Sequence, residues 1–163
     1  MFRNEVIVFA ADYLIVIIAL LVVFFWWRQT KALKKEIIWR AAISFPIIFI
    51  ISRIMGALYY NPRPFVLLNV TPFVAHIADN GFPSDHTLLS AASAALVFSF
   101  NKKWGAVLFI LAILVGVGRV AALVHHPVDI LGSLAAASVA MVAAYYAERF
   151  SKQRRLQMPN KTL

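Results

Sequence analysis

The chain has 163 residues, of which 62% are hydrophobic and only 14% charged, and its mean hydropathy of +0.79 is that of a membrane protein rather than a soluble domain. It contains no cysteine, which excludes a disulfide framework and thiolate chemistry. The net charge of +9 would suit a protein that binds nucleic acid, but the distribution of the charge, described below, has a simpler explanation in membrane topology.

Five apolar segments predict an all-α integral membrane protein, a bundle of about five transmembrane helices in a single domain. The first run is long enough to cross a hydrocarbon core of about 30 Å. Asp12 interrupts this run near its start, and both an interfacial carboxylate and a functional role remain open for it. The expected spans are residues 6–27, 37–60, 84–100, 104–124 and 127–146, followed by a basic tail at 148–163.

The segments between the helices also carry local signals. Residues 61–83 are punctuated by four prolines, and we expect a short interfacial helix at 70–77. Ser84 is the expected N-cap of the third helix, which is rich in serine and alanine and therefore suited to close packing inside a bundle. Pro127 stands in the first turn of the fifth helix, where the missing N–H is harmless.

The basic residues predict the orientation in the membrane. If the helices alternate, the 28–36 loop, the 101–103 turn and the C-terminal tail share one side, with Arg40 at the entrance to the second helix. These segments carry most of the 16 lysines and arginines, so the positive-inside rule makes that side cytoplasmic. We therefore expect a multi-pass plasma-membrane protein whose 61–83 segment faces the extracytoplasmic side, and nucleic acid is not an expected partner.

Three polar clusters from distant parts of the chain fall on that outer side. Arginine suits the bidentate recognition of phosphate oxygens, and the N-terminus of the third helix adds backbone N–H donors. Two histidines on different helices can serve as an acid/base pair or as nucleophile and acid. A carboxylate four residues after a histidine is well placed to hold one ring nitrogen. The clusters are Arg53 with Arg63; Ser84, Asp85 and His86; and Arg119, His125 and Asp129. Together they predict a site for an anionic phosphate.

These clusters resemble the motifs of the type 2 phosphatidic acid phosphatase superfamily, whose fold is shared with vanadium haloperoxidases. Arg-Pro at 63–64, Pro-Ser-x-His at 83–86 and Arg-x5-His-x3-Asp at 119–129 occur in the family's order, and the resemblance covers residues 53–131. The motif sequences FPSDHT and HHPVDI are most similar to those of the bacterial undecaprenyl-diphosphatase branch. The resemblance implies hydrolysis of undecaprenyl diphosphate to undecaprenyl phosphate through a phosphohistidine. Phosphatidylglycerol phosphate or phosphatidic acid remains an alternative substrate.

The resemblance also implies a role for each matched residue. His125 falls on the position of the nucleophile and Asp129 on that of its partner, while His86 would protonate the leaving oxygen. Arg63, Ser84 and Arg119 fall on phosphate-binding positions.

The sequence departs from the family pattern at three positions and in its five rather than six spans. Gly56 stands where the family has a lysine, and we expect Arg53, one helical turn earlier, to take its place. Asp85 replaces a glycine and Gly118 replaces a serine. We count Arg53 and Asp85 with the phosphate-binding residues.

Two other kinds of protein were weighed. His125, Asp129 and His86 could ligate zinc, but the three arginines would repel a cation, so we expect no metal and no cofactor. A non-enzymatic anion or lipid transporter would need polar residues that continue toward the cytoplasm, whereas the inner halves of the spans are apolar apart from Arg40. The expected partners are a lipid phosphate substrate and membrane lipids, and the sequence gives no indication of the oligomeric state. His76 and His126 are interpreted as interfacial.

Overall fold

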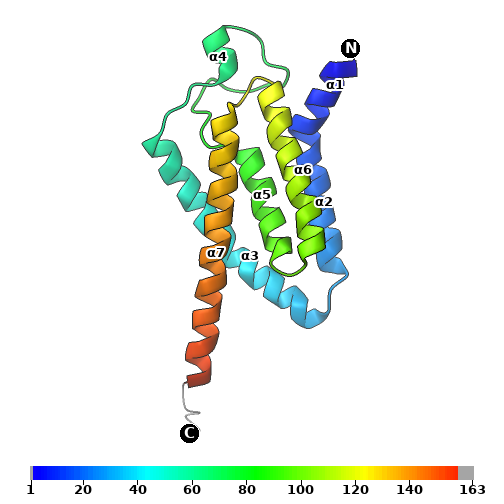
Figure 1. The fold of residues 1–163 in the computed structure, drawn as a ribbon, viewed down its shortest axis with the longest axis vertical. Coiled ribbons are helices and arrows are strands. Elements are labelled where there is room, and N and C mark those ends of the chain that lie inside the picture. Colours follow the sequence, from blue (N-terminus) through cyan, green and yellow to red (C-terminus); the bar gives the residue numbers. More distant parts are fainter. Residues whose placement is uncertain (1, 158–163) are drawn as a thin grey trace.

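The protein is a bundle of helices, and the predicted all-α membrane fold is confirmed (Figure 1). The computed structural model describes residues 2–157, and the side chains of residues 4–150. The helices are α1 (Phe2–Val8), the π-helix η1 (Phe9–Tyr13), α2 (Leu14–Trp27), α3 (Lys31–Leu58), α4 (Pro64–Leu68), α5 (Asp85–Phe98), α6 (Lys102–Ala121) and α7 (Pro127–Gln157).

Four helices in the described part are long and apolar enough to cross a membrane. They cover Asn4–Trp27, Lys31–Leu58, Lys102–Ala121 and Pro127–Phe150. The first of these combines most of α1 with η1 and α2. The fifth expected span is α5, which has 14 residues. At 1.5 Å per residue it is about 21 Å long, shorter than a hydrocarbon core of about 30 Å. The bundle therefore consists of four long helices and one short helix.

The short helix α5 lies inside the bundle, between α6 and α7 (Figure 1). Its small residues allow the neighbouring helices to approach closely, as the sequence predicted, and Ala91, Ala92, Ala94 and Ala95 are all buried. Packing on several sides holds the N-terminal end of α5 in place near the end of the bundle that carries α4 (Figure 1).

Side-chain caps begin two of the long helices at the opposite end of the molecule. The Thr30 hydroxyl accepts a hydrogen bond from the Leu33 N–H at 3.4 Å, and the Asn101 side chain accepts one from the Trp104 N–H at 3.1 Å. Because Thr30 caps α3, this helix starts at Lys31 and takes up most of the predicted basic loop.

The structure corrects two further boundaries. The short helix before α5 is α4, and residues 70–77 form no helix. Pro64 opens α4, because the fixed φ angle of proline suits a first helical turn. The last helix, α7, continues to Gln157, so the part of the predicted tail at 148–157 is helical. The rest of that tail, residues 158–163, lies outside the described residues.

A buried ion pair joins three helices at the end opposite α4. Arg40 of α3 lies 2.7 Å from the Glu148 carboxylate of α7 and donates a hydrogen bond of 2.8 Å to Ser99, the C-cap of α5. Both charged side chains are almost fully buried. Arg40 therefore lies inside the bundle rather than at a helix entrance.

Candidate active site

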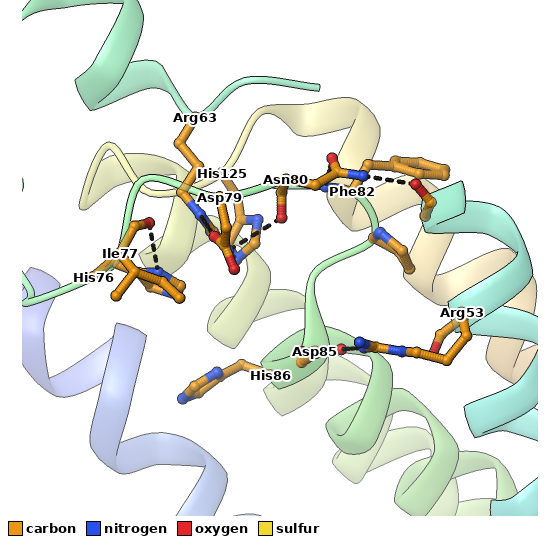
Figure 2. Close-up of a pocket in the computed structure, with 13 residues that line it drawn as sticks. Arg53, Arg63, His76, Ile77, Asp79, Asn80, Phe82, Asp85, His86 and His125 are labelled. Atoms are coloured by element: carbon orange, nitrogen blue, oxygen red, sulfur yellow. Dashed lines mark hydrogen bonds and ion pairs between the residues drawn. The ribbon is translucent and has the colours of Figure 1, made fainter. Parts of the chain in front are cut away.

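The three polar clusters converge on one pocket of about 510 Å³ (Figure 2). It lies between the C-terminal part of α3, the loop that precedes α5, the head of α5 and the α6–α7 corner. Of the predicted site residues, Arg53, Arg63, Asp85, His86 and His125 line it. Ser84, Arg119 and Asp129 are buried and are not among the lining residues.

His125 is buried at the α6–α7 corner with both ring nitrogens engaged. Its Nδ1 lies 2.8 Å from the Gly81 carbonyl oxygen and 3.4 Å from the Asp129 carboxylate. Both of these groups accept hydrogen bonds, so the neutral ring carries its proton on Nδ1 and its lone pair on Nε2. The Arg63 Nη1 lies 3.2 Å from Nε2 and donates to that lone pair. Burial lowers the pKa of His125 and so favours this neutral form, although the hydrogen bond that the ring donates to Asp129 acts in the opposite direction.

Asp129 is fully buried and anchors the corner around His125. One carboxylate oxygen accepts a hydrogen bond of 2.7 Å from the Asn61 side chain, and the other accepts one of 2.7 Å from the His126 N–H. The sequence predicted Asp129 as the partner of His125, but the Gly81 carbonyl is closer to Nδ1. A Cβ at Gly81 would lie 3.1 Å from the Asn61 oxygen and 3.2 Å from the Asp129 carboxylate, so only glycine fits here without displacement.

Arg63 is held beside His125 by three more hydrogen bonds. It donates to the Asp79 carboxylate at 2.7 Å, to the Val124 oxygen at 2.8 Å and to the Asn80 oxygen at 3.3 Å. The guanidinium is buried, whereas the Asp79 side chain is 49% exposed at the edge of the pocket. Asp79 balances the charge of Arg63, and no motif in the sequence indicated this residue.

Arg119 is buried and only partly paired. Its Nη1 donates a hydrogen bond of 2.7 Å to Asp12 on the N-terminal helix. Its Nε and Nη2 have no hydrogen-bond partner among the described residues. Buried donors without a partner are costly, and such donors suit an anionic group that arrives with the substrate.

Ser84 and His86 stand at the head of α5. Ser84 occupies the predicted N-cap position, but its hydroxyl accepts a hydrogen bond from Thr87 at 3.2 Å instead of capping the backbone. The His86 ring points toward the N-terminal helix in Figure 2. Burial and the Arg119 charge lower the pKa of His86 to about 4, so the ring is neutral at neutral pH.

Arg53 and Asp85 form an ion pair of 3.1 Å between α3 and α5 at the pocket (Figure 2). Both side chains are more than half exposed. Gly56, where the related family has a lysine, also lines the pocket, and a Cβ there would lie 3.1 Å from the Phe82 carbonyl oxygen. A lysine at this position would therefore require the backbone near Phe82 to shift.

His76 lines the pocket and is not merely interfacial. Its ring lies edge-on to that of His125, with the ring centroids 6.0 Å apart. Burial lowers the pKa of His76 most, and the positive charge of Arg63 has the second-largest lowering effect on this pKa. The loop that carries His76 has no periodic pattern from which its path could be predicted. His126, by contrast, bonds the Pro62 oxygen through its ring at 3.1 Å and is not among the lining residues.

The fold and the site define the class as an integral membrane helical bundle with a histidine–arginine pocket at one end. Residues 54–153 match the family model of the PAP2 superfamily, and the chain belongs to this family. The described residues contain no group of three or more histidine, cysteine, aspartate or glutamate side chains that could hold a metal ion.

The chain is similar to three curated bacterial proteins. It is 37% identical to the "Bacitracin transport permease protein BcrC" of Bacillus licheniformis, over 78% of this chain and 63% of that protein. It is 34% identical to the "Undecaprenyl-diphosphatase BcrC" of Bacillus subtilis strain 168, over 91% of this chain and 75% of that protein. It is 33% identical to the "Putative undecaprenyl-diphosphatase YbjG" of Escherichia coli K12, over 68% of this chain and 57% of that protein. The predicted resemblance to the undecaprenyl-diphosphatase branch is thereby confirmed.

The fold also occurs in a solved structure. The crystal structure of Aquifex aeolicus LpxE aligns with a TM-score of 0.67 and 22% sequence identity, over 89% of this chain and 84% of that one. At this identity the likeness concerns the fold alone.

Proposed function

We propose that this chain is a membrane phosphatase that removes the terminal phosphate of a polyprenyl diphosphate, converting undecaprenyl diphosphate to undecaprenyl phosphate. The observation that carries the proposal is the His125 ring, whose Nε2 lone pair faces Arg63 in the pocket while its Nδ1 proton is held by Gly81 and Asp129. The names of the curated relatives from Bacillus subtilis and Escherichia coli support the same substrate.

In the proposed reaction, the Arg63 Nη1 turns from the His125 Nε2 to a phosphate oxygen, and the freed Nε2 lone pair attacks the terminal phosphorus in line with the leaving oxygen. The N–P bond forms, the P–O bond to the lipid phosphate breaks, and His86 donates its proton to that oxygen. His86 then takes a proton from the water that cleaves the N–P bond and releases inorganic phosphate. Arg63 and Arg119 stabilise the charge on the equatorial oxygens, and Asp129 stabilises the phosphorylated imidazole ring.

The electrostatics of His86 favour a diphosphate over a phosphate monoester. An anionic substrate beside Arg119 offsets the charge that lowers the pKa of His86, so binding helps the ring to take up a proton. A lipid phosphate is a much weaker base than the alkoxide that would leave from phosphatidic acid. The lipid phosphate therefore needs less protonation from His86, whose pKa is about 4 before the substrate charge acts on it.

The position of the pocket fits a lipid substrate that is approached from the membrane surface. The pocket lies at the α4 end, and the 28–30 and 99–101 turns and the end of α7 lie at the other (Figure 1). Basic residues lie in or next to those segments, among them Arg28, Lys31, Lys102 and Lys103, so the positive-inside rule favours the extracytoplasmic side for the pocket. The polyprenyl tail then lies between helices or along them in the lipid.

Transport is the second candidate, because one relative carries the name of a transport permease. A transporter needs a path from the pocket to the other side of the membrane. Two apolar clusters of buried residues stand against such a path, one around Ile48, Leu88 and Ala112 and one around Ile18, Leu96 and Leu108. We therefore place hydrolysis first.

The test is phosphate release by the detergent-purified protein, with EDTA present, from undecaprenyl diphosphate, phosphatidylglycerol phosphate and phosphatidic acid. We expect the highest kcat/KM for the diphosphate. His125→Ala should lose all but a few per cent of turnover, whereas His126→Ala, which changes the neighbouring ring, should keep most of it. Release from none of the lipids, or substantial turnover by folded His125→Ala, would overturn the proposal. A preference for a monoester would reassign the substrate only.

A further inference from the structure

The N-terminal helix approaches the candidate site through an irregular turn. Residues Phe9–Tyr13 form the π-helix η1 between α1 and α2. A π-helical turn inserts an extra residue and offsets the side chains that follow, and such turns are frequent at functional sites. Asp12 lies in this turn.

The turn packs directly against α6 at Gly118. A Cβ on Gly118 would lie 2.7 Å from the Ala10 carbonyl carbon and 2.7 Å from the Ala11 nitrogen. Main-chain atoms cannot yield as a flexible side chain can, so any larger residue would push η1 away from α6. This close approach accounts for glycine at a position where the family resemblance led us to expect serine.

The close approach brings Asp12 to Arg119, the residue after Gly118. The Asp12 carboxylate accepts a hydrogen bond of 2.7 Å from Nη1, while the Arg119 side chain is 2% exposed. Among the described residues only Nη1 has a hydrogen-bond partner, so the guanidinium is anchored at one nitrogen while its Nε and Nη2 remain available. An arginine whose planar group is oriented in advance loses less freedom when it binds a phosphate.

The same carboxylate also acts on His86. The charged and titratable groups that influence this ring are Arg119, Asp12, His125 and His76, and among them only Asp12 raises the pKa of His86. The His86 ring points toward the N-terminal helix (Figure 2). Asp12 is thus electrostatically linked to both the phosphate-binding arginine and the acid.

We propose that Asp12, brought to α6 by the π-helical turn and the bare backbone of Gly118, is a positioning residue that orients Arg119 toward the substrate phosphate. This inference rests on the proposed phosphatase function. The N-terminal helix lies outside the three motifs and outside the residues matched by the family model. Under this inference it contributes a residue that positions Arg119 in the site.

The experiment compares Asp12→Asn, Asp12→Glu and the matched control Glu5→Gln in purified protein. Glu5 is an exposed carboxylate on the same helix. Asp12→Asn keeps the size of the side chain and removes its charge. We expect it to lower kcat by about 10–10²-fold with a smaller change in KM, because Arg119 acts most strongly on the charge of the transition state. Asp12→Glu should restore part of the loss, and Glu5→Gln should behave as wild type.

The pH profile provides a readout that a purely structural role would not move. Activity that requires protonated His86 falls as the pH rises through the pKa of that ring. Asp12→Asn removes the charge that raises this pKa, so the fall should occur at lower pH than in the wild type. An unchanged profile together with kcat within twofold of wild type in folded Asp12→Asn would overturn the inference.

A second variant decides the matter if Asp12→Asn does not fold. Gly118→Ala retains Asp12 but separates η1 from α6, so it should also lower kcat, and unchanged kcat in this variant would contradict the inference. If wild-type protein releases no phosphate at all, the proposed function fails, whereas an active wild type with indifferent Asp12 and Gly118 variants refutes the positioning role alone.

Discussion

The three arginines of the candidate site differ in how many of their donors already have partners. Arg63 is buried, and its three guanidinium nitrogens all have partners, among them the Nε2 of His125. Arg119 is held at Nη1 by Asp12, and its Nε and Nη2 have no hydrogen-bond partner among the described residues. Arg53 is exposed; it pairs with the exposed Asp85, and its guanidinium lies 5.3 Å from the centre of the Phe49 ring. In the function proposed above, the substrate phosphate therefore binds the two remaining donors of Arg119 and competes with Asp85 for Arg53.

This competition predicts opposite effects of two single changes. An exposed ion pair contributes only about 0–1 kcal/mol, so neither Arg53→Ala nor Asp85→Asn should change stability much. Arg53→Ala should raise KM for the diphosphate about tenfold, and Asp85→Asn should lower KM because it frees the guanidinium. The measurement is steady-state kinetics with a thermal melt of each variant. Wild-type kinetics in folded Arg53→Ala would remove Arg53 from the site.

The site residues that could be predicted act through ionisable side chains, whereas the group that was missed at His125 is a main-chain carbonyl. His125, Asp129, Arg63 and Arg119 carry side chains that are rare in apolar helices, so they were evident. The nearest acceptor for His125 is the main-chain carbonyl of Gly81, and a carbonyl group is common to every residue. Its role depends on the path of the loop, which no local pattern specifies.

Among the helices, the long spans could be predicted from the sequence, whereas a short helix and a contact between helices could not. The four long spans followed from hydropathy, and the interior place of α5 agrees with its small residues. A short helix was expected at 70–77, but the structure has it at Pro64–Leu68, where the fixed φ angle of Pro64 suits the first helical turn. The contact between η1 and Gly118 could not be predicted, because it depends on the distance between two helices far apart in sequence.

The buried Arg40–Glu148 pair predicts a stability effect at the element scale. Arg40→Met removes the Arg40 partner of the buried Glu148 carboxylate, and breaking such a pair costs about 3–5 kcal/mol. The double change Arg40→Met with Glu148→Met should cost much less, because it leaves no buried charge. Unfolding in detergent measures both. Activity per folded molecule should stay near wild type, since the pair lies at the end opposite the pocket. A double variant as unstable as the single one would contradict the assignment.

The whole molecule has a polar, pocket-bearing end and a basic end. The chain has no native cysteine, so its topology can be probed by single introduced cysteines. Leu68→Cys, on exposed α4, should react with an impermeant maleimide in intact cells, whereas Lys103→Cys should react only after permeabilisation. Labelling of both from the same side would refute the proposed orientation.

The central claim is that His125 forms a covalent bond to phosphorus. The most direct test uses undecaprenyl diphosphate labelled in its terminal phosphate, stops the reaction rapidly during turnover without acid, and measures the label bound to the protein. The account predicts label on the protein that is stable to base and labile to acid, and that maps to the peptide containing His125. It also predicts no such label in His125→Ala, and normal labelling in His126→Ala. Full turnover by wild type with no labelled protein at any quench time, or with the label on another residue, would contradict the account.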